Sequence, residues 1–239
     1  MASQEPLRET YPIFTKGDKV QTFFSNAKRP WNAFSNLYTT PVTYAGDEYP
    51  SVEHAFHAQK FLDKTPFTTR GVFGDPTNNF ERGWTAYFAA KTPKGKNAEK
   101  VAQQLTSRHR REKKNTMGVL ARMVNTLSKD PNLRDRLGLV LDPAWTFHAS
   151  HETLWLELIR SKFEAPALRE LLMSTGDTYL IEYQKVATVN GEEWIHFYSA
   201  YYDSATGECK HANNPRSNAI GKFLMKTREH QRKRKADLL

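Results

Sequence analysis

The clearest pattern of apolar and polar positions lies between residues 51 and 62, which read SVEHAFHAQKFL. Apolar side chains recur there at intervals of three and four residues, so the segment is expected to form an amphipathic helix. The stripe expected to face the core consists of Val52, Ala55, Phe56, Gln59 and Leu62. Ser51 is expected to cap this helix, because its hydroxyl can accept a hydrogen bond from a free amide of the first turn.

Helical periodicity predicts four more helices further along the chain. They cover residues 115–127, 152–163, 166–174 and 217 onward. The apolar positions that share one face of the second are Leu154, Trp155, Leu158 and Ile159. Pro166 suits the first position of the third helix, and Gly176 suits its end.

Short extended segments separate these helices. The expected strands are 21–25, two pieces within 41–49 around a turn at Gly46-Asp47, 179–181, and a hairpin within 185–197. That hairpin is expected because Asn190-Gly191 is a favoured two-residue turn. Residues 129–132, with the sequence KDPN, are expected to form a turn as well. The mixture of helices and scattered short strands predicts the α+β fold class.

Composition indicates a folded chain. Of its 239 residues, 38% are hydrophobic and 12% are aromatic, whereas disordered chains hold too few apolar side chains to offset the entropy of ordering. The length suits one domain with elaborations. The longest apolar run is too short to span a membrane, and the start of the chain lacks a signal-peptide pattern. We therefore expect an intracellular protein, cytoplasmic or nuclear, with no membrane partner.

The net charge of +9 is concentrated in two places. Residues 91–114 contain nine Lys or Arg against two Glu, and residues 226–239 contain six against one Glu and one Asp. Two local patches of +7 and +4 on a nearly neutral remainder favour a polyanionic partner, with nucleic acid as the leading candidate. The alternative is that these lysines and arginines serve solubility.

Several kinds of site lack their usual sequence motif. Cys209 is the one cysteine, so neither an internal disulfide nor a cysteine-based zinc site is possible. His54 and His57, like His148 and His151, are three residues apart, but neither pair forms an H-E-x-x-H motif. Glycine-rich dinucleotide and triphosphate motifs are absent from the sequence too, so we expect no metal and no cofactor.

The helix at 51–62 also carries the strongest candidate for chemistry. At 100° per residue, Glu53, His57 and Lys60 fall within about 60° of each other, away from the apolar stripe. Glu53 lies in the first turn, where the helix dipole favours an ionised carboxylate. Such a group can stabilise an oxocarbenium ion or act as a base toward water, as the cleavage of glycosidic bonds requires. The alternative is an ordinary solvated helix face.

A second candidate is the turn at 211–218, HANNPRSN, which runs into the last predicted helix. Backbone amides, an arginine and a helix N-terminus could together bind an anion such as a phosphate. The alternative is a plain loop with a helix cap.

Three ordered motifs resemble the NADAR family, also called YbiA-like. The first, FFSNAKRPWNAFSNLYTTPVTYAGDEYPSVEHAFHAQKF, resembles the opening of that family over about residues 22–61. LIRSKFEAPALRELLMSTGDTYLIE and SNAIGKFLMKTRE resemble two later blocks. Residues 65–144 are mostly unmatched, so we expect a single NADAR-like domain at 11–230, a basic insertion at about 65–144 and a basic tail at 231–239.

The resemblance implies an α+β fold, mostly helical, with short strands around a pocket for ribose phosphate or ADP-ribose. It also implies an N-glycosidase, in which Glu53 and Lys60 match the acid and the lysine that perform the chemistry. Lys60 has two possible roles, as a nucleophile that forms a Schiff base or as an electrostatic group. The residues expected to bind the substrate are Ser35, Asn36, Tyr49, His57, Trp145, Trp194, Arg216, Asn218 and Gly221.

One branch of the family removes ADP-ribose from the amino group of guanine in nucleic acid, and another acts on phosphorylated riboflavin intermediates. The basic patches favour the first. The expected partner is ADP-ribosylated nucleic acid, with ADP-ribose as product and an ADP-ribosyltransferase as a possible counterpart. A non-catalytic ADP-ribose binding module is the alternative outside enzymes. The loop before the last helix, DSATGECKHANNPRS, departs from the glycine-rich turn of the family.

Overall fold

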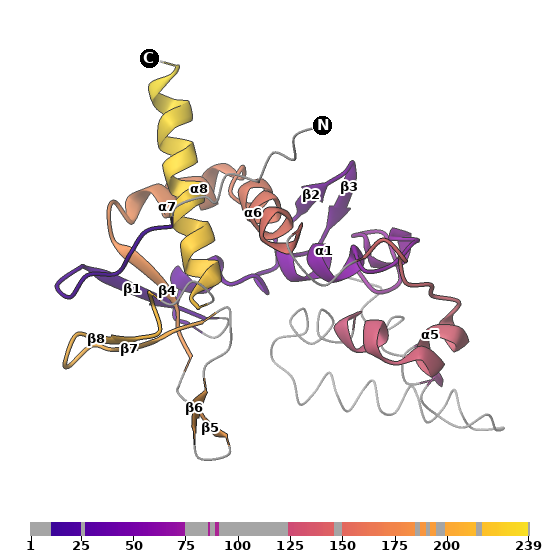
Figure 1. Ribbon diagram of the computed structural model, residues 1–239. Coiled ribbons are helices and arrows are strands. Elements are labelled where there is room, and N and C mark those ends of the chain that lie inside the picture. The colour runs from indigo at the N-terminus through magenta and orange to yellow at the C-terminus, as the bar shows by residue number, and fades with distance from the viewer. Residues whose placement is uncertain are drawn as a thin grey trace, which may run out of the picture. The chain divides into compact units, whose positions relative to one another are not determined.

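The structure is a computed structural model that describes residues 11–24, 27–74, 86, 89–90, 124–145, 150–184, 187–189, 192–194, 199–213 and 217–238 (Figure 1). The contacts divide the chain into two compact units. Unit 1 consists of Met1–Trp31 and Arg169–Leu239, and unit 2 is Asn32–Leu168. Helices and short strands are mixed along the chain, which confirms the α+β class. The prediction of one domain with an insertion stays a prediction.

Unit 1 is built around two strands that are far apart in sequence. β1 (Val20–Phe23) pairs in parallel with β4 (Tyr179–Glu182). The helix α8 (Ala219–Ala236) packs against β4. Gly221 makes this close approach possible, since a Cβ there would collide with the carbonyl oxygen of Leu180. α8 thus begins with its backbone directly against β4.

Two hairpins complete the strands of unit 1. β5 (Ala187–Val189) pairs with β6 (Glu192–Trp194), and β7 (Tyr201–Asp203) pairs with β8 (Glu208–Lys210) (Figure 1). The helix α7 (Pro166–Ser174) precedes β4 and is followed by Gly176, whose positive φ of 54° suits a glycine. The segment after α7 is held by Arg228, which is buried and donates to Thr175 Oγ1 and to the carbonyl of Thr178.

Unit 2 holds a helical core beside one hairpin. The 3₁₀ turn η1 (Trp31–Phe34) leads to β2 (Val42–Tyr44) and β3 (Asp47–Tyr49), which form an antiparallel pair. The helix α1 (Val52–Ala58) follows directly and packs against α6 (Ser150–Lys162), which also contacts β2. Fully buried side chains at the centre of this unit include Val52, Ala55, Leu158, Ile159 and Phe163.

The described part of unit 2 also contains three shorter helical elements. They are η2 (Thr65–Phe67), a helical segment at 124–129 and α5 (Pro131–Leu137). Phe61 forms a β-bridge with Leu141, and the amide of Leu62 donates to the carbonyl of Val140 at 2.9 Å. The chain is therefore in an extended pairing three residues after α1.

That pairing corrects the predicted length of the first helix. The expected helix ran to Leu62, but α1 ends at Ala58, and the amide of Lys60 bonds to the carbonyl of His57 in a tighter turn. Leu62, expected in the buried stripe, is 61% exposed. The remaining stripe residues are buried as expected.

Two other expectations differ from the structure, and several are confirmed. Residues 129–132 do not form an isolated turn, because Asp130 caps α5 with its side chain on the amide of Leu133. The β7–β8 hairpin was not expected. The helix at 152–163 and the strands near 21–25, 41–49 and 179–181 are confirmed, but the first hairpin turns at Ala45-Gly46, one residue before the predicted Gly46-Asp47. None of the helices in the described part of the chain is long and apolar enough for a membrane crossing.

Candidate functional site

The start of α1 is fixed by two hydrogen bonds. Ser51 Oγ accepts from the amide of His54 at 3.2 Å, as the cap prediction requires. The amide of Glu53 donates to the carbonyl of Asn36 at 3.1 Å. The loop that contains Ser35 and Asn36 is therefore attached to the first turn of the helix through the backbone of Glu53.

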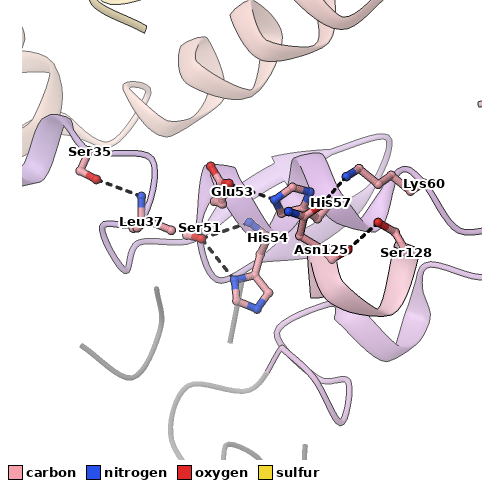
Figure 2. A network of polar contacts seen from close by, with 9 residues as sticks. All are labelled: Ser35, Leu37, Ser51, Glu53, His54, His57, Lys60, Asn125 and Ser128. Atoms are coloured by element: carbon pink, nitrogen blue, oxygen red, sulfur yellow. Dashed lines mark hydrogen bonds and ion pairs between the residues drawn. The ribbon is translucent and has the colours of Figure 1, made fainter. Parts of the chain in front are cut away.

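Glu53 and His57 form a hydrogen-bonded pair one turn apart. The Nε2 of His57 lies 2.9 Å from Glu53 Oε1 (Figure 2). Because a carboxylate only accepts, the shared proton is on Nε2. The Nδ1 of the same ring is buried and has no hydrogen-bond partner among the described residues. When the ring is neutral, this nitrogen is a free acceptor.

The charge states of this pair follow from its surroundings. Burial favours the neutral form of Glu53, but the hydrogen bond and charge of His57, with the charges of Lys60 and His54, outweigh it and hold the pKa of Glu53 below its ordinary value. Burial lowers the pKa of His57 despite the hydrogen bond and charge of Glu53, which raise it. At neutral pH, Glu53 is thus ionised and His57 is neutral.

Lys60 lies just after α1 and is 7% exposed. Its Nζ donates to Oδ1 of Asn125 at 2.9 Å, from the helical segment 124–129 (Figure 2). Burial, followed by the charge of Lys129, lowers the pKa of Lys60 to about 8, although the charge of Glu53 raises it. A pKa of about 8 leaves roughly a tenth of the amine unprotonated at pH 7. The solvated-face alternative does not describe a lysine buried to this degree.

His54 is a neighbour with a structural role. It is fully buried, its Nε2 lies 3.1 Å from the carbonyl of Phe73, and its Nδ1 lies 3.3 Å from Ser51 Oγ. Burial lowers the pKa of His54 to about 4, so the ring stays neutral at ordinary pH. Both nitrogens are used within unit 2, which attaches the segment near Phe73 to α1.

A buried lysine also holds the loop at 35–36. Lys162 of α6 is 1% exposed and donates its Nζ to the carbonyl of Ser35 at 2.7 Å. Ser35 Oγ accepts from the amide of Leu37 at 3.2 Å. The Oδ1 of Asn36 is buried and has no hydrogen-bond partner among the described residues. Asn36 therefore offers an acceptor beside the Glu53 amide.

Aromatic rings pack around Phe56, which is three residues from Glu53 and therefore lies about 60° from it around α1. Phe56 is stacked on Trp155 with 4.1 Å between ring centroids, and Trp145 meets it edge-on at 5.7 Å. Trp145 is itself stacked on His151 at 4.5 Å, and its Nε1 is buried without a partner among the described residues. One face of the Trp145 indole is thus covered by the His151 ring, while its Nε1–H is a donor without a partner among the described residues.

The other residues expected to bind substrate are occupied or lie elsewhere. Tyr49 is fully buried, and its hydroxyl accepts from Gln59 Nε2 at 3.2 Å. In unit 1, Asn218 Nδ2 donates to the carbonyl of Leu180 at 2.9 Å and its Oδ1 accepts from the amide of Glu182 at 3.1 Å. Asn218 thus has a structural role through these bonds, and Gly221 has one through its packing against β4. The substrate-binding roles of both residues stay predictions. Arg216 and the side chain of Trp194 lie outside the described residues.

The structure thus brings together, within unit 2, the residues Ser35, Asn36, Glu53, His57 and Lys60. Sequence reasoning missed Asn125, Lys129 and Lys162. The signal available for Asn125 was its polar side chain directly after the buried Val124. The signal for Lys162 was its place inside a motif that resembles the family. Among the described residues, no three His, Cys, Asp or Glu side chains are grouped so that they could hold a metal ion.

Comparison with known proteins gives one similar structure. No protein-family model matches the chain, and no curated protein matches it. An NMR structure of the E. coli protein YbiA is similar at 21% sequence identity, over 92% of this chain and 88% of that chain, with a TM-score of 0.46. A similarity at this level says nothing of the substrate or the reaction.

Proposed function

We propose that the chain is an N-glycosidase that hydrolyses the bond between a ribose C1 and an exocyclic amine, with ADP-ribose on guanine in DNA or RNA as its substrate. One observation carries the proposal. At the buried edge of α1, an ionised carboxylate is hydrogen-bonded to a neutral imidazole and lies near an amine with a pKa of about 8. Groups with such shifted pKa values gather at catalytic sites more often than on ordinary helix faces.

The reaction breaks one carbon–nitrogen bond and forms one carbon–oxygen bond. The electron pair of the broken bond passes to the guanine nitrogen, and positive charge develops on the ribose C1. Ionised Glu53 stabilises this charge, or removes a proton from the attacking water, and the proton ends on the guanine amine. The neutral ring of His57 holds the carboxylate in place through its Nε2–H.

Free polar atoms near Glu53 suit a sugar. Asn36 Oδ1 and His57 Nδ1 are both acceptors without a partner among the described residues. Ribose hydroxyls are donors, so they match these atoms better than a carboxylate or a phosphate would. We assign the two acceptors to hydroxyl groups of the bound ribose.

The choice of nucleic acid over a small metabolite depends on charge. Residues 91–114 and 226–239 carry +7 and +4, and basic patches of this kind attract the phosphates of a polynucleotide. In the described part of the second patch, the side chains from Arg232 to Leu238 are exposed at the end of α8.

The test is incubation of the protein with an oligonucleotide that carries ADP-ribose on guanine, followed by chromatography of released ADP-ribose. We expect release by the natural chain and loss of release in Glu53→Gln. Phosphorylated riboflavin intermediates, tested in parallel, would give the greater turnover if the small-molecule alternative is correct. Tight binding of ADP-ribose with no turnover of either substrate would favour a binding module.

A further inference from the structure

The amine of Lys60 has neighbours from a part of the chain that the sequence motifs leave unmatched. Asn125 and Lys129 lie on the helical segment 124–129, inside the region predicted as an insertion. Lys60 Nζ donates to Asn125 Oδ1 at 2.9 Å, which joins two segments that are 65 residues apart. This contact directs the amine of a nearly buried side chain.

The helical segment presents two groups to this amine. Residues four apart lie on the same helix face, so Lys129 follows Asn125 by one turn on that side. Ser128 Oγ donates to the carbonyl of Asn125 at 2.7 Å, which fixes the backbone from which the amide projects. The Asn125 acceptor thus projects from a hydrogen-bonded helical turn, and Lys129 follows one turn further on.

We propose that Asn125 and Lys129 are positioning residues for Lys60, the first by fixing the direction of its amine and the second by placing a like charge one helical turn from the Asn125 acceptor. This inference rests on the proposed function, because it concerns the lysine assigned to the same reaction. It gives the helical segment 124–129 a role in the reaction, in addition to the nucleic-acid binding that the basic side chains of the predicted insertion suggest.

Within the part of the chain that the structure describes, the charged and titratable neighbours of Lys60 come from three segments. On α1 they are Glu53, which favours the ammonium form, and His57. On 124–129 it is Lys129, which opposes the ammonium form. From 138–142 it is Asp142, whose amide donates to the Lys60 carbonyl at 2.9 Å and whose carboxylate lies 3.9 Å from Lys64 Nζ. Lys129 is the neighbour whose removal should make Lys60 more basic.

Two variants separate the two contributions. Lys129→Met removes the like charge, and we expect the pKa of Lys60 to rise by about half a unit. Asn125→Asp keeps the shape of the acceptor and adds a negative charge at hydrogen-bond distance, and we expect a rise of about 1 to 3 units. Lys129→Arg should restore the natural value. Arg70→Met is the matched control, because Arg70 is an exposed cation of unit 2 that does not act on Lys60.

The measurement is a pH titration of ¹³C-labelled lysine side chains by NMR, with the Lys60 signal assigned from Lys60→Arg. Circular dichroism checks that each variant is folded. A Lys60 pKa that moves no further in Lys129→Met than in Arg70→Met would overturn the role of Lys129. An unchanged pKa in a folded Asn125→Asp would overturn that of Asn125.

Activity provides the second readout. If the unprotonated amine takes part in the reaction, the pH profile of kcat should move to higher pH by the same amount as the pKa, and activity at pH 7.5 should fall about threefold in Lys129→Met. A shifted pKa with an unmoved profile would also overturn the inference. If even the natural chain releases no ADP-ribose, the proposed function fails, while the titration still decides whether these two residues control the Lys60 amine.

Discussion

Substitution of Glu53 by Gln tests the central claim about the site. The amide of Gln can still accept a hydrogen bond from His57 Nε2–H, so the main contact of the side chain is preserved while its charge is removed. Two unit charges about 4 Å apart attract by about 4 kcal/mol at an effective dielectric constant of about 20. The Glu53 side chain is 25% exposed, so water screens part of this energy. We therefore expect turnover to fall about a hundredfold, which corresponds to about 2.7 kcal/mol.

The assay is the release of ADP-ribose from the modified oligonucleotide under single-turnover conditions, so that binding and chemistry are separated. Affinity for the substrate should change little, since the carboxylate acts on charge that develops only in the transition state. Ser51→Ala is the comparison variant for Glu53→Gln, because it leaves the Glu53 charge in place. It removes the cap that accepts from the His54 amide and should cost about 1 kcal/mol of stability. Near-natural turnover by a folded Glu53→Gln protein would refute a catalytic carboxylate.

Three further predictions concern other groups. If Lys60 acts as a nucleophile, borohydride added during turnover should attach one substrate-derived mass to its peptide, and activity should rise with pH through about 8. Robust turnover without an adduct, or a fall in activity above that pH, would favour an electrostatic role. His54 should make the protein less stable by up to about 3 kcal/mol between pH 6.5 and 4, because only the unfolded chain binds a proton there. Chemical denaturation should show this loss for the natural chain and not for His54→Gln. Replacing Lys233, Arg234 and Lys235 with Gln should reduce the salt dependence of duplex binding by up to about 0.9 for each phosphate that the tail no longer neutralises, and an unchanged slope would assign the tail to solubility.

Local patterns explain what the sequence predicts well. The helix at 152–163 and the cap at Ser51 depend on residues within one or two turns, so the sequence itself contains the information. The grouping of Glu53 with His57 has the same origin, because residues four apart on a helix face each other. The 2.9 Å hydrogen bond between His57 Nε2 and Glu53 Oε1 follows from that spacing.

Distant contacts explain the rest. α1 ends at Ala58 because Phe61 and Leu62 pair with residues 140 and 141, about eighty positions away, and no feature of the segment 51–62 reveals that partner. The burial of Lys60 has the same cause, since its amine meets Asn125. The side chain of Asn218 is likewise hydrogen-bonded to the distant strand β4, a contact that its motif does not reveal, and its substrate-binding role stays a prediction.

The two opposing effects on the pKa of Lys60 can be ranked once these contacts are known. A sequence shows that burial would make the amine less basic and that Glu53 would make it more basic, but it gives no measure of either. In the structure, burial and the charge of Lys129 together outweigh Glu53, and the pKa of Lys60 falls to about 8 from an ordinary value of 10.5. Roughly a tenth of the amine is then unprotonated at pH 7, compared with less than about a thousandth for an ordinary lysine. This gain of roughly three hundredfold in unprotonated amine makes a Schiff-base role chemically accessible. In the proposed reaction, the ionised Glu53 would stabilise the charge on C1 in either mechanism.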